Sequence, residues 1–261
     1  MRRPLVLAAL LLAVLASPSR AAVTSVEGAD ISWPNCPIGM GIPERPTEGR
    51  PMPLDTARFV VLGLTNGPGF TPNPCLASQV AWARAHGRST GAYAITSYPT
   101  PAQLARYGGH GAGLQRLFRT GAAEANANLR TLRAARLSTP MLWVDVEPVR
   151  LAPWSATPAR NNAVIDGAVA AYRAAGLRVG FYSYAYAWRQ ITGGRRLPTY
   201  PTWVPAGNDQ RASALGKCSV ASFSGGPVHL AQWTVAQRDR NLTCPAYSSP
   251  AQVRRMFRPA A

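Results

Sequence analysis

Short apolar segments alternate with segments of helical spacing, and this alternation most constrains the fold of the chain. Seven segments are predicted as strands because they are largely apolar and end at turn residues: 29–33, 59–65, 91–96, 141–146, 178–184, 202–204 and 228–234. Helical spacing is found over 75–86, 101–107, 114–136, 161–175 and 250–257. Alternation without an internal linker predicts one α/β domain, either a β/α barrel or an open parallel sheet.

The N-terminus has the pattern of a secretory signal peptide. Two arginines precede an apolar run over residues 4–15, and a Ser-Arg-Ala cleavage site ends at residue 21. The apolar run is shorter than the roughly 20 residues that span a bilayer. We therefore expect a signal peptide over 1–21, one domain over 22–261, and export to the extracellular space or cell wall without membrane insertion.

Four cysteines in an exported chain predict two disulfide bonds. We favour Cys36–Cys75 and Cys218–Cys244, because each pair closes a local, loop-rich stretch. No two cysteines have the spacing of metal ligands, and only three histidines are present. We expect no metal and no cofactor.

The chain is strongly basic, so its few acidic residues stand out. It has 28 Lys and Arg residues, of which only Lys217 is lysine, against 11 acids, and its formal net charge is +17. Asp145 and Glu147 end an apolar run, and residues i and i+2 of a strand share one face, about 6–7 Å apart. Crowding and burial push the pKa values of two such carboxyls apart, so that one can hold a proton while its neighbour stays ionised. The alternative is a strand end whose acids cap a helix or pair with arginine.

Two further acids lie at strand ends, where barrel enzymes build their sites. Asp30 lies in the first apolar run, and Asp239 follows the last one. Taken alone, Asp30 is explained equally well as a solvated strand end. Taken alone, Asp239 lies between two arginines and is most simply explained as part of a surface ion pair. Aromatic rings gather at the same ends and suit sugar faces, although buried aromatics more often belong to the core. They are Trp33, Trp143, Tyr182, Tyr184, Tyr186, Trp203 and Trp233.

Other catalytic templates are missing from the sequence, which has no G-x-S-x-G, no H-E-x-x-H and no P-loop. The glycine-rich segment 108–113 has no preceding strand and no Lys-Ser/Thr, so we interpret it as a loop. Arginine is scattered along the chain rather than gathered in a stripe, which argues against a nucleic-acid partner.

The strand ends share residues, in order, with a known family. The segments are Gly28-Ala-Asp30-Ile-Ser32, 59–65, Gly91-Ala-Tyr93, Trp143-Val-Asp145-Val-Glu147, Gly180-Phe-Tyr182-Ser183, Trp203, Ala231-Gln-Trp233-Thr and Asp239-Arg-Asn241. This set resembles glycoside hydrolase family 25, the lysozymes or N-acetylmuramidases that cleave bacterial peptidoglycan. The resemblance implies a single irregular TIM-like β/α barrel with its active site at the C-terminal ends of the strands.

The resemblance also implies roles for the acids. Glu147 would donate a proton to the glycosidic oxygen, and Asp145 would position the N-acetyl group or stabilise the charge that develops on the sugar. Asp30 and Asp239 would complete the acidic floor. A nucleophilic carboxylate and assistance by the substrate's acetamide both fit these residues. The sugar-binding residues would be Tyr182, Trp203 and Trp233.

The predicted function is therefore a secreted, monomeric glycoside hydrolase that cleaves β-1,4 bonds of peptidoglycan or a related cell-wall glycan. Removing the three arginines of the signal peptide reduces the charge from +17 to +14, which would attract the protein to an anionic wall. The chain departs from the family at Thr65-Asn66-Gly67, where an acid is common, and a lysine of that strand is also missing. The alternative is a catalytically inactive or repurposed barrel that binds wall glycan. A chitinase shares the Asp-x-Glu ending but has a longer acidic motif upstream, which this chain lacks.

Overall fold

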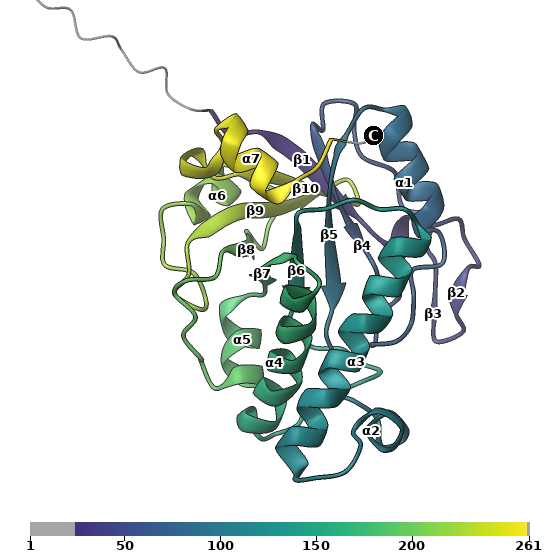
Figure 1. The fold of residues 1–261 in the computed structure, drawn as a ribbon. Helices are drawn as coiled ribbons and strands as arrows, with labels where there is room; N and C mark the ends of the chain where they lie inside the picture. Colours follow the sequence, from purple (N-terminus) through teal and green to yellow (C-terminus); the bar gives the residue numbers. More distant parts are fainter. Residues whose placement is uncertain (1–23, 260–261) are drawn as a thin grey trace, which may run out of the picture.

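Eight strands close into a barrel in this computed structural model, which describes residues 24–259 (Figure 1). The order around the barrel is β1-β10-β9-β8-β7-β6-β5-β4. The strands are β1 Glu27–Ile31, β4 Phe59–Gly63, β5 Ser89–Ile95, β6 Met141–Asp145, β7 Arg178–Tyr182, β8 Thr202–Pro205, β9 Val228–Val235 and β10 Arg238–Thr243. Two short strands, β2 (Gly41–Ile42) and β3 (Arg45–Pro46), form a separate hairpin in the loop after β1. The predicted β/α barrel is confirmed, and the alternative prediction of an open parallel sheet is wrong.

Helices surround the barrel, and α3 and α4 lie side by side along its outside (Figure 1). The helices are α1 Leu76–Ala85, α2 Pro101–Tyr107, α3 Gly113–Ala134, α4 Pro158–Ala174, α5 Ala185–Thr192, α6 Arg211–Lys217 and α7 Pro250–Met256. A Cβ built on Gly121 of α3 would lie 2.0 Å from the carbonyl oxygen of Val164 in α4, and one on Gly167 would lie 1.9 Å from that of Phe118. The two helices therefore pack backbone against backbone.

The predicted helices are confirmed, but α5 and α6 are absent from the prediction. They have only 8 and 7 residues, too few turns to display a clear helical period. The strand predicted over 178–184 ends at Tyr182, and Tyr184 is instead the residue that precedes α5.

The prediction also lacks β10, and this corrects the position of Asp239. The sequence places Asp239 after the last strand, whereas the structure places it within β10, antiparallel to β9 and β1. Ala236 and Gln237 have positive φ values of 50° and 58°, as in a two-residue hairpin turn. The start of β10 is polar, so the apolar alternation that identifies strands is missing there.

The core has a layer inside the barrel and a layer outside it. Inside, Phe59, Trp143 and Trp203 are no more than 1% exposed. Glycines make room for these rings: a Cβ on Gly28 would lie 2.5 Å from the ring of Phe59, and one on Gly180 would lie 2.5 Å from that of Trp143. The outer layer joins strands to helices and includes Val60, Leu62, Leu129, Leu142, Val144 and Ile165.

The C-terminal segment closes the end of the barrel at which the parallel strands begin. Phe257, directly after α7, stacks on Phe59 at the start of β4 with ring centroids 4.1 Å apart. Ser249 caps the start of this helix, since its side chain accepts a hydrogen bond from the backbone N–H of Gln252. The opposite end, where the parallel strands finish, remains available for a site.

Both predicted disulfide bonds are present. Cys36–Cys75 ties the loop after β1 to the start of α1, and Cys218–Cys244 ties the end of α6 to the end of β10. The first bond ties down the long loop after β1, whereas the second spans a stretch that contains both β9 and β10.

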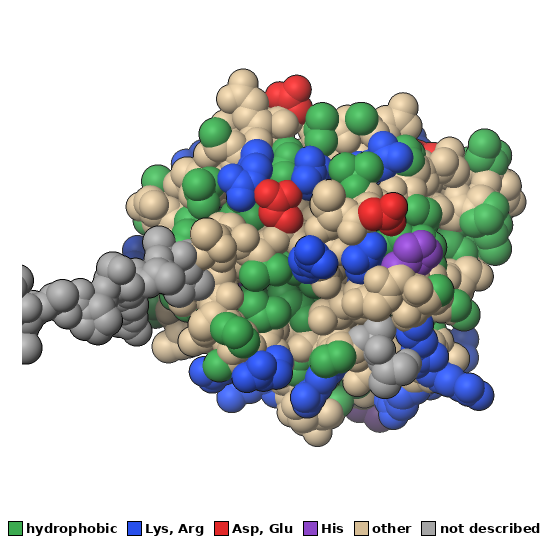
Figure 2. Space-filling view, turned by 90° about the horizontal axis from the view of Figure 1, so that it is seen from above, with side chains coloured by type: hydrophobic (Ala, Val, Ile, Leu, Met, Phe, Trp, Pro, Cys, Tyr) green, Lys and Arg blue, Asp and Glu red, His purple; other side chains and the backbone are tan. Residues whose placement is uncertain are grey.

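Basic side chains are spread over the surface. The face in Figure 2 carries Lys and Arg side chains in several groups, with few acids between them. Over residues 24–259, no helix combines the length and apolar character needed to span a membrane. The predicted signal peptide, 1–21, lies outside the described residues.

Candidate active site

Four acidic side chains line one cleft of the barrel. The cleft has a volume of about 400 Å³, and its walls include Asp30, Asp145, Glu147 and Asp239. Asp30 comes from β1 and Asp145 ends β6. Because β10 runs against the other strands, its beginning reaches the same end of the barrel, and Asp239 is the register partner of Asp30. The structure thus brings together all four acids that the sequence predicts as catalytic.

The sequence predicts that Glu147 shares a strand face with Asp145. The structure instead places Glu147 just beyond the end of β6. The strand ends at Asp145, but the N–H of Val146 still donates to the carbonyl of Tyr182 at 3.0 Å. The carbonyl of Glu147 accepts a hydrogen bond from the indole of Trp154 at 2.9 Å. The backbone is therefore held on both sides of Glu147, and its carboxyl lines the same cleft as that of Asp145.

Burial raises the pKa of both carboxyls. Desolvation, followed by the charges of Glu147 and Asp30, holds the pKa of Asp145 well above its usual range, and Arg45 opposes the rise. Desolvation raises the pKa of Glu147, the charge of Arg45 lowers it, and the charge of Asp239 raises it further. Neither carboxyl forms an ion pair within residues 24–259. Neutralisation by a direct arginine contact, the alternative from the sequence, is therefore wrong.

One oxygen of Asp145 is buried without a partner. The side chain is 3% exposed, and its Oδ1 accepts no hydrogen bond from any described residue. An unsatisfied buried acceptor costs about 1–3 kcal/mol. A donor on a bound ligand would therefore be favourable at this oxygen.

Asp30 lies in a network of amides. Its Oδ1 accepts from Gln232 at 2.9 Å and from Asn241 at 2.6 Å. Burial, together with the charge of Asp239, raises the pKa of Asp30 to about 8 against these hydrogen bonds. The tendency of this carboxyl to hold a proton is thus set by its position inside the barrel.

Asp239 does not pair with the arginines beside it in sequence. Arg240 binds Glu27 at 2.8 Å, and Arg238 donates to the carbonyl of Met52 at 2.9 Å. Asp239 instead accepts from the hydroxyl of Thr234 at 2.6 Å, and burial raises its pKa. The interpretation as a surface ion pair is wrong.

The three predicted sugar-binding aromatics differ in exposure. The Tyr182 hydroxyl donates to Gln232 at 2.9 Å, and the ring lines the cleft. Trp203 is 1% exposed at the cleft floor, and its indole N–H donates to Asn241 at 2.7 Å. Trp233 is 2% exposed, and the guanidinium of Arg240 lies 5.0 Å from its ring centroid. Tyr182 is thus the only one of the three that is more than marginally accessible.

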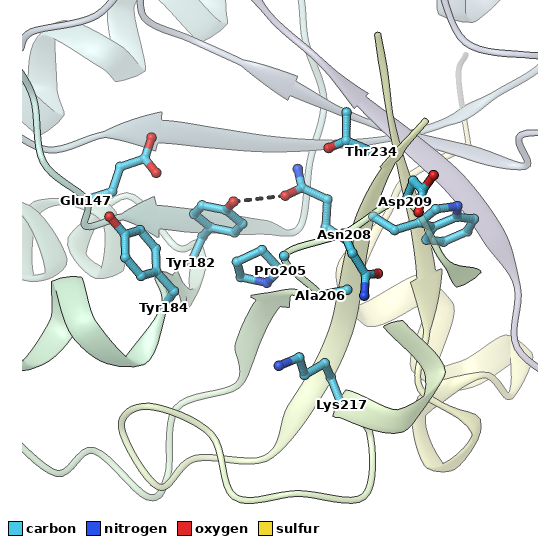
Figure 3. A pocket seen from close by; sticks show the side chains of 12 residues that line it. Glu147, Tyr182, Tyr184, Pro205, Ala206, Asn208, Asp209, Lys217 and Thr234 are labelled. Atoms are coloured by element: carbon cyan, nitrogen blue, oxygen red, sulfur yellow. Dashed lines mark hydrogen bonds between the residues drawn. The ribbon is translucent and has the colours of Figure 1, made fainter. Parts of the chain in front are cut away.

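A second cavity of about 660 Å³ adjoins the cleft (Figure 3). Figure 3 shows Glu147, Tyr182 and Tyr184 close together along its wall, with Lys217 entering from the end of α6. Four residues line both spaces: Glu147, Tyr182, Gln232 and Thr234. The predicted proton donor therefore lies where the two spaces meet.

Sequence reasoning assigns no role to three residues of the site. Gln232 and Asn241 connect Asp30 to Tyr182 and Trp203. Both lie inside segments that carry the family resemblance, so a signal for them exists. Arg45 comes from the β2–β3 hairpin, and no sequence pattern points to it. Among residues 24–259, no cluster of His, Cys, Asp or Glu is arranged to hold a metal ion.

Two sequence comparisons point to lysozyme-like proteins. The family model described as Lysozyme-like protein 1 matches residues 115–221, which include Asp145 and Glu147. Lysozyme-like protein 5 of Caenorhabditis elegans is 36% identical over 72 residues, covering 28% of this chain and 32% of that protein. The match thus spans about a third of that relative's length.

Solved structures match nearly the whole barrel. A family GH25 lysozyme from Aspergillus fumigatus aligns with a TM-score of 0.58 at 17% identity, covering 89% of this chain and 99% of the other. A muramidase from Acremonium alcalophilum gives 0.55 at 18% identity, with 84% and 93% covered. The lysozyme from Streptomyces coelicolor gives 0.54 at 15%, with 84% and 91% covered. These comparisons confirm the resemblance that the strand-end motifs predict: the chain has the fold of the glycoside hydrolase family 25 lysozymes.

Proposed function

We propose that the protein is a glycoside hydrolase that cleaves β-1,4 bonds of peptidoglycan. The observation that carries the proposal is the Asp145–Glu147 pair, two carboxyls in one cleft with raised pKa values and no ion pair. Glycoside cleavage needs a protonated carboxyl next to an ionised one. A desolvated pair that cannot easily carry two negative charges favours this singly protonated state.

Glu147 is assigned as the acid. It lies at the meeting point of two cavities, so a glycan in both would place a glycosidic oxygen beside it. Its proton passes to that oxygen as the bond to the anomeric carbon breaks. Glu147 then accepts a proton from the water that completes hydrolysis.

Asp145 is assigned the role of contacting the sugar whose glycosidic bond is broken. Its unpartnered Oδ1 can accept a hydrogen bond from the N–H of an N-acetyl group. This contact would orient the acetamide oxygen toward the anomeric carbon, and the negative charge would stabilise the oxocarbenium-like transition state. The orphaned acceptor supports this role for Asp145.

Peptidoglycan is proposed as the substrate because of the relatives and the charge. The autolysin LytC from Streptococcus pneumoniae, solved in complex with a synthetic peptidoglycan ligand, aligns with a TM-score of 0.55 at 14% identity. The net charge, +17 for the whole chain and +14 without residues 1–21, would draw the protein to an anionic wall polymer. Two disulfide bonds fit an exported protein, and we propose that it acts as a monomer outside the cell or at the wall.

The test is the release of reducing ends from purified peptidoglycan by the wild type and by Glu147→Gln. The wild type should release new reducing ends, and the variant should be slower by about 10²-fold or more. Glu124→Gln is the matched control, because Glu124 is also a buried glutamate with a raised pKa but does not line the cleft. A wild type that binds the wall and releases nothing would instead indicate a glycan-binding barrel.

A further inference from the structure

The β2–β3 hairpin is anchored beside the cleft by a buried amide. Asn66, which is 0% exposed, accepts a hydrogen bond from the N–H of Ile42 at 3.0 Å and donates to the carbonyl of Arg45 at 3.2 Å. The Cys36–Cys75 bond ties the same loop to α1. Both anchors involve groups other than the Arg45 side chain, so they fix the backbone that carries it.

The side chain of Arg45 is held at the cleft without an acidic partner. Its guanidinium carbon lies 4.6 Å from the centroid of the Trp33 ring, and the side chain lines the cleft together with the four acids. Gly67, with a φ of +99°, leaves the space it needs, since a Cβ there would lie 2.7 Å from its Nη1. Within the described residues Arg45 forms no ion pair, whereas Arg50, the next base of the loop, binds Glu48 at 2.6 Å.

The charge of Arg45 acts on both members of the acidic pair. It lowers the pKa of Asp145 and of Glu147, in opposition to burial, and among residues 24–259 it is the only cation with that effect on either carboxyl. Arg50 acts on Asp239 instead. The other titratable and charged groups that line the cleft around the pair are Asp30, Glu48, Arg50, Tyr93, Tyr182 and Asp239.

We propose that Arg45 is a positioning residue for the reaction, whose guanidinium, held on the Trp33 ring in the same cleft as the Asp145–Glu147 pair, keeps one negative charge on that pair. This inference rests on the proposed function. Without Arg45, the four carboxyls that line the cleft would face one another, and the one other cation among the described residues of the cleft, Arg50, is paired with Glu48. The pair would then remain doubly protonated to a higher pH and would lack the negative charge that stabilises the transition state.

The test is the pH dependence of kcat/KM for reducing-end release by the wild type, Arg45→Met and Arg45→Lys. Removal of a nearby cation raises the pKa of a carboxyl by about 1 unit or more. Both limbs of the bell-shaped profile should therefore move to higher pH by about one unit in Arg45→Met, with about a tenfold loss on the acidic limb. Arg45→Lys should largely restore the wild-type profile. Arg254→Met, on α7 at the opposite end of the barrel, controls for the change in net charge.

A second readout does not depend on activity. The carboxyl ¹³C resonances of Asp145 and Glu147, identified with Asp145→Asn and Glu147→Gln, are titrated in the wild type and in Arg45→Met. Upward shifts of both pKa values in the variant support the effect of Arg45 on the pair. This readout is separate from the proposed function, which fails if the wild type releases no reducing ends. Unchanged titrations overturn the inference. A raised KM with an unmoved pH profile also overturns it and makes Arg45 a substrate-binding residue.

Discussion

Replacing Gly167 by alanine should destabilise the protein, although alanine is the better helix former. Gly167 lies inside α4, where helix propensity alone favours alanine by about 1 kcal/mol. A Cβ at this position would lie 1.9 Å from the carbonyl oxygen of Phe118 in α3 and 2.8 Å from its carbonyl carbon. Carbon and oxygen normally approach to about 3.3 Å, so the two helices would have to separate by more than about 1 Å.

The expected loss follows from the nature of the obstacle. Overpacking a close contact typically costs about 1–3 kcal/mol. The obstructing atoms belong to the backbone of α3, which cannot rotate away as a side chain would, so the cost should lie at the upper end of this range. We therefore expect a net loss of about 2 kcal/mol after the gain in helix propensity. In a domain of this size, such a loss lowers Tm by roughly 4–8 °C.

The assay is urea unfolding followed by circular dichroism, with the disulfide bonds kept oxidised. Gly216→Ala is the matched control, because Gly216 lies in α6 and a Cβ there would meet nothing within 4 Å. This control should be neutral or gain up to about 1 kcal/mol. A Gly167→Ala protein that is as stable as the wild type, with an unchanged m value, would refute the backbone-to-backbone packing of α3 and α4.

Two further predictions concern stability. The buried carboxyl of Glu124 has a pKa raised from 4.5 to about 8 by desolvation, so the folded state binds its proton more tightly and loses stability as pH rises through this window. The free energy of unfolding of Glu124→Gln, measured in urea and taken relative to that of the wild type, should therefore rise by roughly 2–4 kcal/mol when the pH is raised from 5 to 8.5. The same difference between variant and wild type at both pH values would contradict this. Replacing Cys36 and Cys75 together by serine should cost about 4 kcal/mol, because their bond closes a loop with a sequence separation of 39. A loss below about 1 kcal/mol in the same assay would show that the unfolded state is not restrained by this bond.

Several features of this protein follow from local sequence patterns. The alternation of strands and helices predicts the barrel class, and acids at strand ends predict a shared site, because the C-terminal ends of parallel strands meet at one edge. Asp30, Asp145 and Glu147 could therefore be found without coordinates. The disulfide pairing could be predicted as well, since each bond joins cysteines that lie near each other in the sequence, 39 and 26 residues apart.

Other features required the tertiary structure, because they depend on residues that are far apart in sequence. Asp30 is held by Gln232 and Asn241, which are 202 and 211 residues away. The sequence assigns Asp239 to the site, but only the structure shows that it reaches the site on the antiparallel strand β10. Arg45 is missing from the prediction altogether and reaches the site on a hairpin that is anchored on Asn66. Periodicity and spacing report which face of its own element a residue occupies. The pKa of a buried carboxyl depends instead on the charges and donors that the closed barrel places around it.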